Sequence, residues 1–149
     1  MSLKKYKEKR NLKKSGEPIS NSKEKNPKHI YVIHEHHASH LHWDLRLQIR
    51  GVLKSWAIPK QPPRSKNMKR LAIQVEDHPL SYANFEGEIP RGNYGAGKVE
   101  IWDKGKLKIL ELTKDKIEFE LFGEKLSGKY LLIRAKLGGE KKNWLFFKI

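Results

Sequence analysis

The ten residues from His40 to Ile49 alternate between polar and apolar side chains without a break. This period of two is typical of a β-strand, because successive side chains of a strand point to opposite faces of the sheet. One face would carry the polar side chains, which are His40, His42, Asp44, Arg46 and Gln48. The other face would pack against a core through Leu41, Trp43, Leu45, Leu47 and Ile49. A solvent-facing row usually consists of Thr, Lys, Ser or Glu, so a row of imidazoles, a carboxylate and a guanidinium indicates a functional site.

Shorter stretches of β character continue through the rest of the chain. We expect strands at 30–33, 40–50, 52–58, 71–76, 98–102, 106–112, 116–122, 129–135 and 143–149. Gly51 predicts a turn that joins the strands 40–50 and 52–58 into a hairpin. Further turns are predicted at 103–105 and 137–139. The prolines and glycines of 59–69 and 77–97 predict loops, and a connection as long as the second is usually functional or disordered. Many short strands predict an all-β fold with little helix, as a small closed or nearly closed β-barrel or as a sandwich.

Residues 1–28 differ in composition from the rest of the chain. They hold ten Lys or Arg residues against three Glu, and Pro18 and Pro27 interrupt them. A weak helical period occurs around 3–14. We expect a disordered basic N-terminal arm over 1–28 that follows phosphates electrostatically, and a single barrel domain over 29–149.

The whole chain is strongly basic, with a formal net charge of +15 over 149 residues. Such a balance predicts a polyanionic partner, most often nucleic acid, with a merely soluble surface as the alternative. The absence of cysteine excludes disulfides, thiolate zinc sites and cysteine nucleophiles. No apolar run approaches the ~18 residues of a membrane span, and no signal-peptide core follows the start, so we expect a cytoplasmic protein without membrane contact.

The histidines are clustered, since six of the seven fall within residues 29–42. His42 and Asp44 are two residues apart on one strand face, so both can reach the same ion. Imidazole with carboxylate suits Mn, Fe, Zn, Co or Ni, and geometry selects among them. A third ligand would come from a neighbouring strand, with His36 as the first choice and His34 and His40 as substitutes. Plain solvation of exposed histidines is the competing interpretation.

Arg46 lies on the same predicted face, two residues beyond Asp44. A guanidinium does not bind a cation, but it can hold a phosphate or carboxylate oxygen that the ion also binds; a salt bridge to Asp44 is the alternative. His78 follows a strand end, where it suits a fourth ligand, a general acid or an oxyanion donor, or else a structural turn. Tyr82 and Tyr94 are oxyanion donors or packing residues.

Five motifs in order resemble the 3′-phosphoesterase module of bacterial DNA ligase D. They are VIHEHHASHLHWDLRL at 32–47, GVLKSWAIPK at 51–60, VEDHP at 75–79, FEGEIP at 85–90, and GNYGAG at 92–97 leading to WDKG at 102–105. The resemblance implies a small β-barrel that binds manganese in a groove and repairs DNA 3′ ends. A terminal ribonucleoside would be removed first, and the remaining 3′-phosphate would then be hydrolysed to a 3′-hydroxyl.

The resemblance also implies roles for single residues. The metal ligands would be His36, His42 and Asp44, holding Mn²⁺, with Zn²⁺, Co²⁺ or another divalent transition metal as alternatives. Arg46 and His78 would contact the scissile phosphate, and Tyr82 would support the site. Lys60 and Arg70 match basic residues near the phosphate.

The N-terminal arm resembles the family's N-terminal segment, in which an Arg-Asp pair and a later Glu contribute to the active site. Arg10 and Glu17 match, but Asn11 replaces the Asp, so we expect the ribonuclease step to be the one impaired. The expected substrates are DNA primer–templates or 3′ ends that carry a phosphate or a ribonucleotide. We expect a monomeric stand-alone enzyme that works with a separate ligase or polymerase.

Two other functions compete with this one. In a non-haem iron oxygenase, His42, Asp44 and His78 would form a two-histidine, one-carboxylate triad. The further histidines and the net charge of +15 favour a phosphate substrate instead. A non-catalytic nucleic-acid-binding barrel would need aromatic residues on the polar strand face, whereas Trp43 lies on the opposite face.

Overall fold

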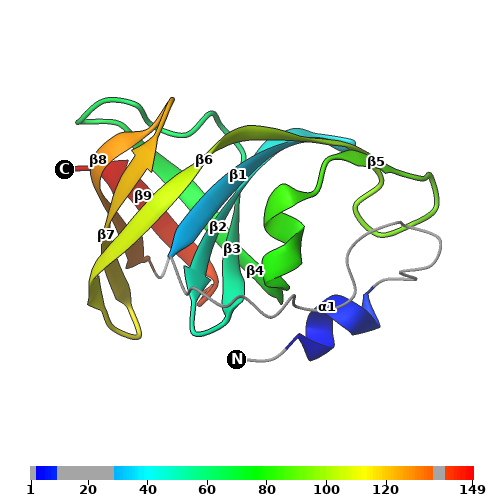
Figure 1. The fold of residues 1–149 in the computed structure, drawn as a ribbon, viewed down its shortest axis with the longest axis horizontal. Helices are drawn as coiled ribbons and strands as arrows, with labels where there is room; N and C mark the ends of the chain where they lie inside the picture. Colours follow the sequence, from blue (N-terminus) through cyan, green and yellow to red (C-terminus); the bar gives the residue numbers. More distant parts are fainter. Residues whose placement is uncertain (1–2, 10–28, 136–139) are drawn as a thin grey trace.

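The computed structural model describes residues 3–9, 29–135 and 140–149 (Figure 1). Arg10, Asn11, Glu17 and the predicted turn at 137–139 lie outside the described residues. In the part of the chain that is described, no helix is long and apolar enough to cross a membrane. The short helix α1 (Lys4–Glu8) falls within the stretch with the weak helical period.

The rest of the described chain is almost entirely β-structure. The strands are β1 (Ile30–His37), β2 (Leu41–Ile49), β3 (Val52–Ile58), β4 (Lys69–His78), β5 (Gly87–Ile89), β6 (Gly97–Leu112), β7 (Lys116–Gly123), β8 (Ser127–Arg134) and β9 (Asn143–Lys148). A 3₁₀ helix, η1 (Leu80–Asn84), connects β4 to β5. The segment 77–97, predicted as an irregular loop, thus contains both η1 and β5, and Tyr82 and Ala83 of η1 are buried.

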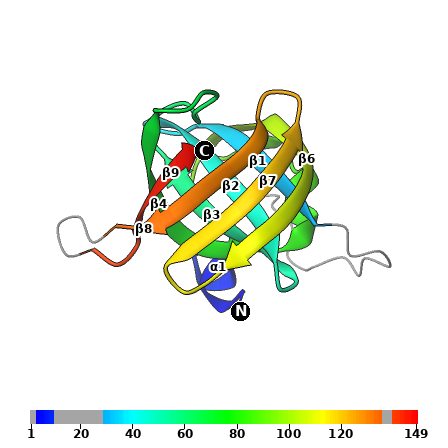
Figure 2. The same cartoon turned by 90° about the vertical axis from the view of Figure 1, so that its left-hand side faces the viewer.

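The strands form a closed antiparallel barrel, which confirms the prediction. Eight strands follow one another around it in the order β1-β2-β3-β4-β9-β8-β7-β6, and pairing of β6 with β1 closes the ring. Figure 2 shows the strands slanting across the barrel wall. β5 pairs with residues 97–99 of β6, on the part of that strand's edge that β7 does not cover. Closure pairs each of the eight strands with a neighbour on both sides.

The predicted turn at 103–105 is wrong, because β6 runs through it as one strand of 16 residues. The pairing with β1 shifts register between Ile33 and His34, so this point is a β-bulge. Asp103 accepts hydrogen bonds from Tyr31 Oη at 2.7 Å and from the backbone N–H of Leu126 at 2.9 Å. Gly105 lies so close to β7 that a Cβ would overlap the carbonyl oxygen of Phe122. These turn-type residues therefore mark a bend held by long-range contacts.

Two layers of buried side chains lie on opposite sides of β2. The barrel interior is filled by aliphatic and aromatic residues, including Trp43, Leu45, Leu47, Trp56, Phe119 and Phe146. A smaller cluster outside the barrel consists of Tyr6, Val32, Leu53, Tyr82 and Ala83. The polar row of β2 lies on this outer side but does not face solvent, since Asp44, Arg46 and Gln48 are each no more than 5% exposed. The covering layer turns a strand face into a buried site.

Candidate active site

The site begins with the antiparallel pairing of β1 and β2. The register places His36 opposite His42 and His34 opposite Asp44. Directly paired residues project from the same face of a sheet, so all four side chains point to the outer side of the barrel. His40 precedes β2 and is exposed, and Gln48 Oε1 accepts a hydrogen bond from the backbone N–H of Ile30 at 3.0 Å. Neither His40 nor Gln48 joins the cluster.

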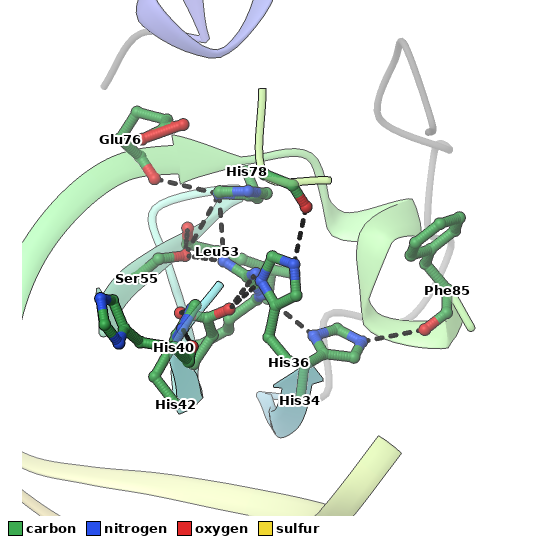
Figure 3. A network of polar contacts seen from close by, with 12 residues as sticks. His34, His36, His40, His42, Leu53, Ser55, Glu76, His78 and Phe85 are labelled. Carbon is green, nitrogen blue, oxygen red and sulfur yellow. Dashed lines mark hydrogen bonds and ion pairs between the residues drawn. The ribbon is translucent and has the colours of Figure 1, made fainter. Parts of the chain in front are cut away.

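His36, His42 and Asp44 form a possible metal site, because one donor atom from each lies within 4.8 Å of the other two. His36 Nδ1 is 3.5 Å from Asp44 Oδ2, and His42 Nε2 is 3.2 Å from Asp44 Oδ1. Figure 3 shows the His36 and His42 side chains close together beside the dashed contacts. His34, on the same face, points instead to the carbonyl of Phe85 (Figure 3).

The other nitrogen of each imidazole is engaged by a backbone carbonyl. His36 Nε2–H donates to Gly95 O at 2.7 Å, and His42 Nδ1–H donates to His40 O at 3.1 Å. A carbonyl only accepts, so these bonds leave lone pairs on His36 Nδ1 and His42 Nε2 facing an acceptor carboxylate. Such an arrangement requires a proton or a cation between the groups. The donor set and the carbonyl-fixed imidazoles therefore fit a possible metal site.

Asp44 is the electrostatic centre of the cluster. Burial alone would raise the pKa of Asp44, but Arg46 and the hydrogen bonds with His36 and His42 hold that pKa well below its usual range. Burial would lower the pKa of His42, but the hydrogen bond and charge of Asp44 outweigh it and raise the pKa. The carboxylate is therefore ionised at neutral pH and available to a cation.

Arg46 is 3% exposed and spans the site. Its Nε donates to His34 Nδ1 at 3.1 Å, its Nη1 to Ser55 Oγ at 2.9 Å, and its Nη2 to Asp44 Oδ2 at 3.4 Å. The guanidinium also lies 4.8 Å from the centre of the Tyr82 ring. Burial, followed by the charge of Arg46, lowers the pKa of His34 to about 3. His34 is thus a neutral residue that orients Arg46.

His78 lies on the far side of the guanidinium, at the end of β4. Its Nδ1 is 3.0 Å from the carbonyl oxygen of Glu76 and 3.2 Å from Arg46 Nη1. With a proton on Nδ1 the contact to Glu76 is a hydrogen bond, and without one the nitrogen accepts from Arg46. The rings of Tyr82 and Tyr6 meet His78 edge-on, with centroids 4.7 and 4.9 Å away. His78 is therefore held on several sides.

These groups surround one cavity of about 280 Å³. Seven residues singled out from the sequence line it, namely His36, His42, Asp44, Arg46, His78, Tyr82 and Tyr94. Lys60 and Arg70 are not among the lining residues; Lys60 is exposed after β3, and Arg70 Nε donates to Gln61 O at 2.8 Å.

Three contributors were missed by sequence reasoning. Tyr6, from α1, is fully buried against His78, and the weak helical period around it was the one signal. Ser55 of β3 orients Arg46, and a lone serine in a strand gives no signal. Gly95 supplies the carbonyl that holds His36, at a positive φ of 73° that favours glycine.

Comparison with known proteins agrees with this geometry. The model of a family described as the DNA ligase D 3′-phosphoesterase domain matches residues 34–134. The multifunctional non-homologous end joining protein LigD of Pseudomonas aeruginosa is 46% identical over 153 residues, covering 98% of this chain and 18% of that protein. The Mycobacterium tuberculosis LigD, named as a DNA repair protein, is 45% identical over 138 residues, covering 89% of this chain and 18% of its own. The LigD of Mycolicibacterium smegmatis is 41% identical over 152 residues, covering 94% and 19% respectively.

The chain thus spans less than a fifth of the length of these relatives. The family model covers more than half of the chain and includes His36, His42 and Asp44 of the possible metal site as well as Arg46, His78 and Tyr82. The chain therefore belongs to the DNA ligase D 3′-phosphoesterase domain family.

Proposed function

We propose that this protein is a metal-dependent 3′-phosphoesterase that prepares DNA ends for repair by converting a 3′-phosphate to a 3′-hydroxyl. The observation that carries the proposal is the contact between Asp44 and Arg46 in one cavity. The Asp44 carboxylate attracts a cation, and the buried Arg46 guanidinium lies beside it. A phosphate monoester suits this pair, because its oxygens can bind the cation and the guanidinium together. Family membership supports a role in processing DNA ends in non-homologous end joining.

His36, His42 and Asp44 are the proposed metal ligands, and Mn²⁺ is the proposed ion, with Zn²⁺ or Co²⁺ as substitutes. When bound, such an ion acts as a Lewis acid toward a phosphoryl oxygen. The carbonyls of Gly95 and His40 fix the two imidazoles in the orientation that ligation needs.

Arg46 is proposed to stabilise the transition state. A guanidinium has five N–H donors, and the bonds to His34, Ser55 and Asp44 engage three of them. A fourth faces His78 Nδ1 at 3.2 Å and is released when that nitrogen is protonated. The donors that are then left suit a phosphoryl oxygen on which charge develops as water attacks phosphorus. Because its contacts also hold it rigidly, little reorganisation accompanies the reaction.

His78 is proposed as the acid. In the hydrolysis, water adds to phosphorus, the bond between phosphorus and the 3′ oxygen breaks, a proton passes to that oxygen, and one proton of the added water is returned from the product phosphate to the acid. His78 lies beside Arg46 in the same cavity and is the proposed source of this proton. Tyr82 contacts both groups and is proposed to position them rather than to react.

Lys60 and Arg70 act outside the cavity in this proposal. Lys60 and Arg70 would contact the DNA backbone away from the reacting phosphate. Removal of a 3′-terminal ribonucleoside would depend on the segment with Arg10, Asn11 and Glu17, so phosphate release is the principal proposed activity. A ligase or polymerase would use the resulting 3′-hydroxyl in a later step.

The oxygenase alternative used His78 as its third ligand, whereas the cluster of three donors contains His36 in its place. Arg46 lies between Asp44 and His78 and contacts both. No observation favours this alternative.

One experiment tests the proposal with a matched pair of variants. A labelled primer–template that ends in a 3′-phosphate or a 3′-ribonucleotide is incubated with Mn²⁺, Zn²⁺, Co²⁺ or EDTA, and products are separated on a gel. We expect metal-dependent phosphate release that His42→Ala abolishes. His40→Ala removes an exposed imidazole two residues away and should leave release unchanged. Equal activity of the two variants, or full activity in EDTA, would contradict the proposed site.

A further inference from the structure

A second depression, with a volume of about 790 Å³, lies next to the active-site cavity and is here called the basic groove. Its walls come from α1, β3, β4 and the segment before β9. The lysines that line it are Lys4, Lys5, Lys9, Lys54, Lys141 and Lys142. Arg134 adds a further cation, and Glu76 and Asp77 are the carboxylates of the lining. Positive charge is therefore in clear excess along the groove.

The basic groove and the active-site cavity are joined. Val75, Glu76 and Tyr94 line both of them. Lys9 stands at this junction, with Nζ 3.3 Å from Glu76 Oε1, 3.4 Å from Tyr94 Oη and 5.0 Å from the Tyr94 ring centre. A polymer lying in the groove would thus pass Lys9 and Tyr94 as its end enters the cavity.

The groove wall that carries Lys9 is anchored to the site itself. Tyr6, three residues before Lys9, is fully buried and packs edge-on against His78 and Tyr82. Figure 1 shows α1 close to the end of β4, to which the active-site residues Glu76 and His78 belong. The position of Lys4, Lys5 and Lys9 relative to the reacting centre is therefore set by direct contact.

We propose that the basic groove holds the DNA strand whose 3′ end is processed, with Lys9 at the phosphodiester nearest that end and Tyr94 against the terminal base. The inference rests on the proposed function and adds the path and polarity of the strand. A strand carries one negative charge per nucleotide, which a line of lysines neutralises. Tyr94 is 46% exposed at the junction, and an exposed aromatic ring beside a basic track suits base stacking.

The first test compares two triple variants that remove the same charge. Lys54, Lys141 and Lys142 are replaced by alanine in the groove variant. Lys104, Lys108 and Lys129, which are exposed on β6 and β8 and line neither the groove nor the cavity, are replaced in the control. Binding of a fluorescent primer–template with a 3′-hydroxyl is measured by anisotropy over a range of salt concentrations.

The slope of log K for DNA binding against the logarithm of salt concentration should become shallower in the groove variant by about 0.9 for each phosphate contact removed. The groove variant should also bind DNA at least about tenfold more weakly near 0.1 M salt. The control variant should show a much smaller change in the salt slope and in the affinity for DNA. Equal losses in the two variants would overturn the groove as the track. If poly-glutamate binds as tightly as the oligonucleotide and its binding is weakened equally by the groove substitutions, the groove would be assigned to an acidic protein. That result would also overturn the groove as the DNA track.

The second test uses the absence of cysteine from the chain, which makes any introduced cysteine unique. Lys54→Cys and, as a control, Lys108→Cys are crosslinked through a disulfide to DNA with a thiol tether on one defined phosphate. We expect Lys54→Cys to react with tethers upstream of the primer 3′ end and Lys108→Cys to react with none. Preferred reaction of Lys54→Cys with the template strand would refute the proposed polarity.

Catalysis gives a third measurement that separates this inference from the proposed function. Tyr94→Ala should raise KM for a primer–template about tenfold, as loss of one stacked base predicts, while Tyr94→Phe stays near the wild type. Neither should change turnover of glycerol 2-phosphate, a phosphate monoester that carries no base to stack on Tyr94. An equal loss on both substrates would overturn the role of Tyr94. Because binding and crosslinking need no hydrolysis, absence of phosphate release from every substrate would overturn the proposed function alone.

Discussion

Asp44→Asn is the substitution that most directly tests the proposed metal site, because it keeps the shape of the side chain and removes its charge. Asp44 is 5% exposed, and its carboxylate faces His36, His42 and the buried Arg46 within 3.2 to 3.5 Å. Removing one partner of a buried ion pair costs about 3–5 kcal/mol. The asparagine oxygen still accepts from Arg46, so we expect the lower end, about 3 kcal/mol, or a fall in Tm of about 10 °C.

The same substitution should abolish the response to metal. A ligand that binds only the folded state at 100 times its Kd stabilises by about 2.7 kcal/mol. Added Mn²⁺ should therefore raise the Tm of the wild type by roughly 5–10 °C. Loss of an outer-shell partner already weakens metal affinity by about 10–100-fold, so loss of a ligand should exceed 100-fold and remove this increment.

Asp103→Asn provides the matched control. Asp103 is equally buried, at 5% exposure, and accepts hydrogen bonds from Tyr31 and the 124–126 backbone, away from the metal cluster. We expect it to lower the Tm in EDTA but to keep the full Mn²⁺ increment and phosphate release. Thermal unfolding with EDTA or Mn²⁺ measures both quantities. A full Mn²⁺ increment in Asp44→Asn, or near-normal phosphate release, would refute the assignment of Asp44 as a ligand.

Three further predictions concern the surroundings of the cluster. Arg46→Lys keeps the charge but loses the planar fork, so phosphate release should fall by about 100-fold or more while the Mn²⁺ increment in Tm persists; parallel loss of both would contradict a role in binding phosphate. Burial and the hydrogen bond to Asp103 raise the pKa of Tyr31 above its usual value, so its stabilising contribution is complete below about pH 10 and is lost as the pH rises further. Urea denaturation of Tyr31→Phe should show a shallower alkaline loss of stability than the wild type, and identical slopes would exclude Tyr31 as the source. Tyr6→Ala should detach α1 from the barrel and reduce the rate of phosphate release. It should lower the Tm less than Phe119→Ala, which leaves a cavity in the barrel core at a cost of about 3–5 kcal/mol. A larger fall in Tm for Tyr6→Ala than for Phe119→Ala would mean that α1 unfolds together with the barrel.

Local residue patterns were sufficient to predict most strands of the barrel. The alternation at 40–49 led to a predicted strand at 40–50, which exceeds β2 by one residue at each end, because the period of two is a property of the strand itself. Turn chemistry was less reliable. Asp103, Lys104 and Gly105 read as a turn, yet their requirements are met by a distant tyrosine and by the opposite strand. Such long-range contacts leave no trace in the local residue pattern.

The sequence by itself determined which chemical groups lie on one face of β2. His42, Asp44 and Arg46 share that face because strand geometry allows no other arrangement. Only the tertiary structure decided which imidazole meets them. The register of β1 against β2 sets His36 opposite His42, whereas a slip of one residue would turn His36 to the opposite face. Only packing of η1 and α1 over β2 removed water from the polar row, and that burial gives the contact between Asp44 and Arg46 its electrostatic strength.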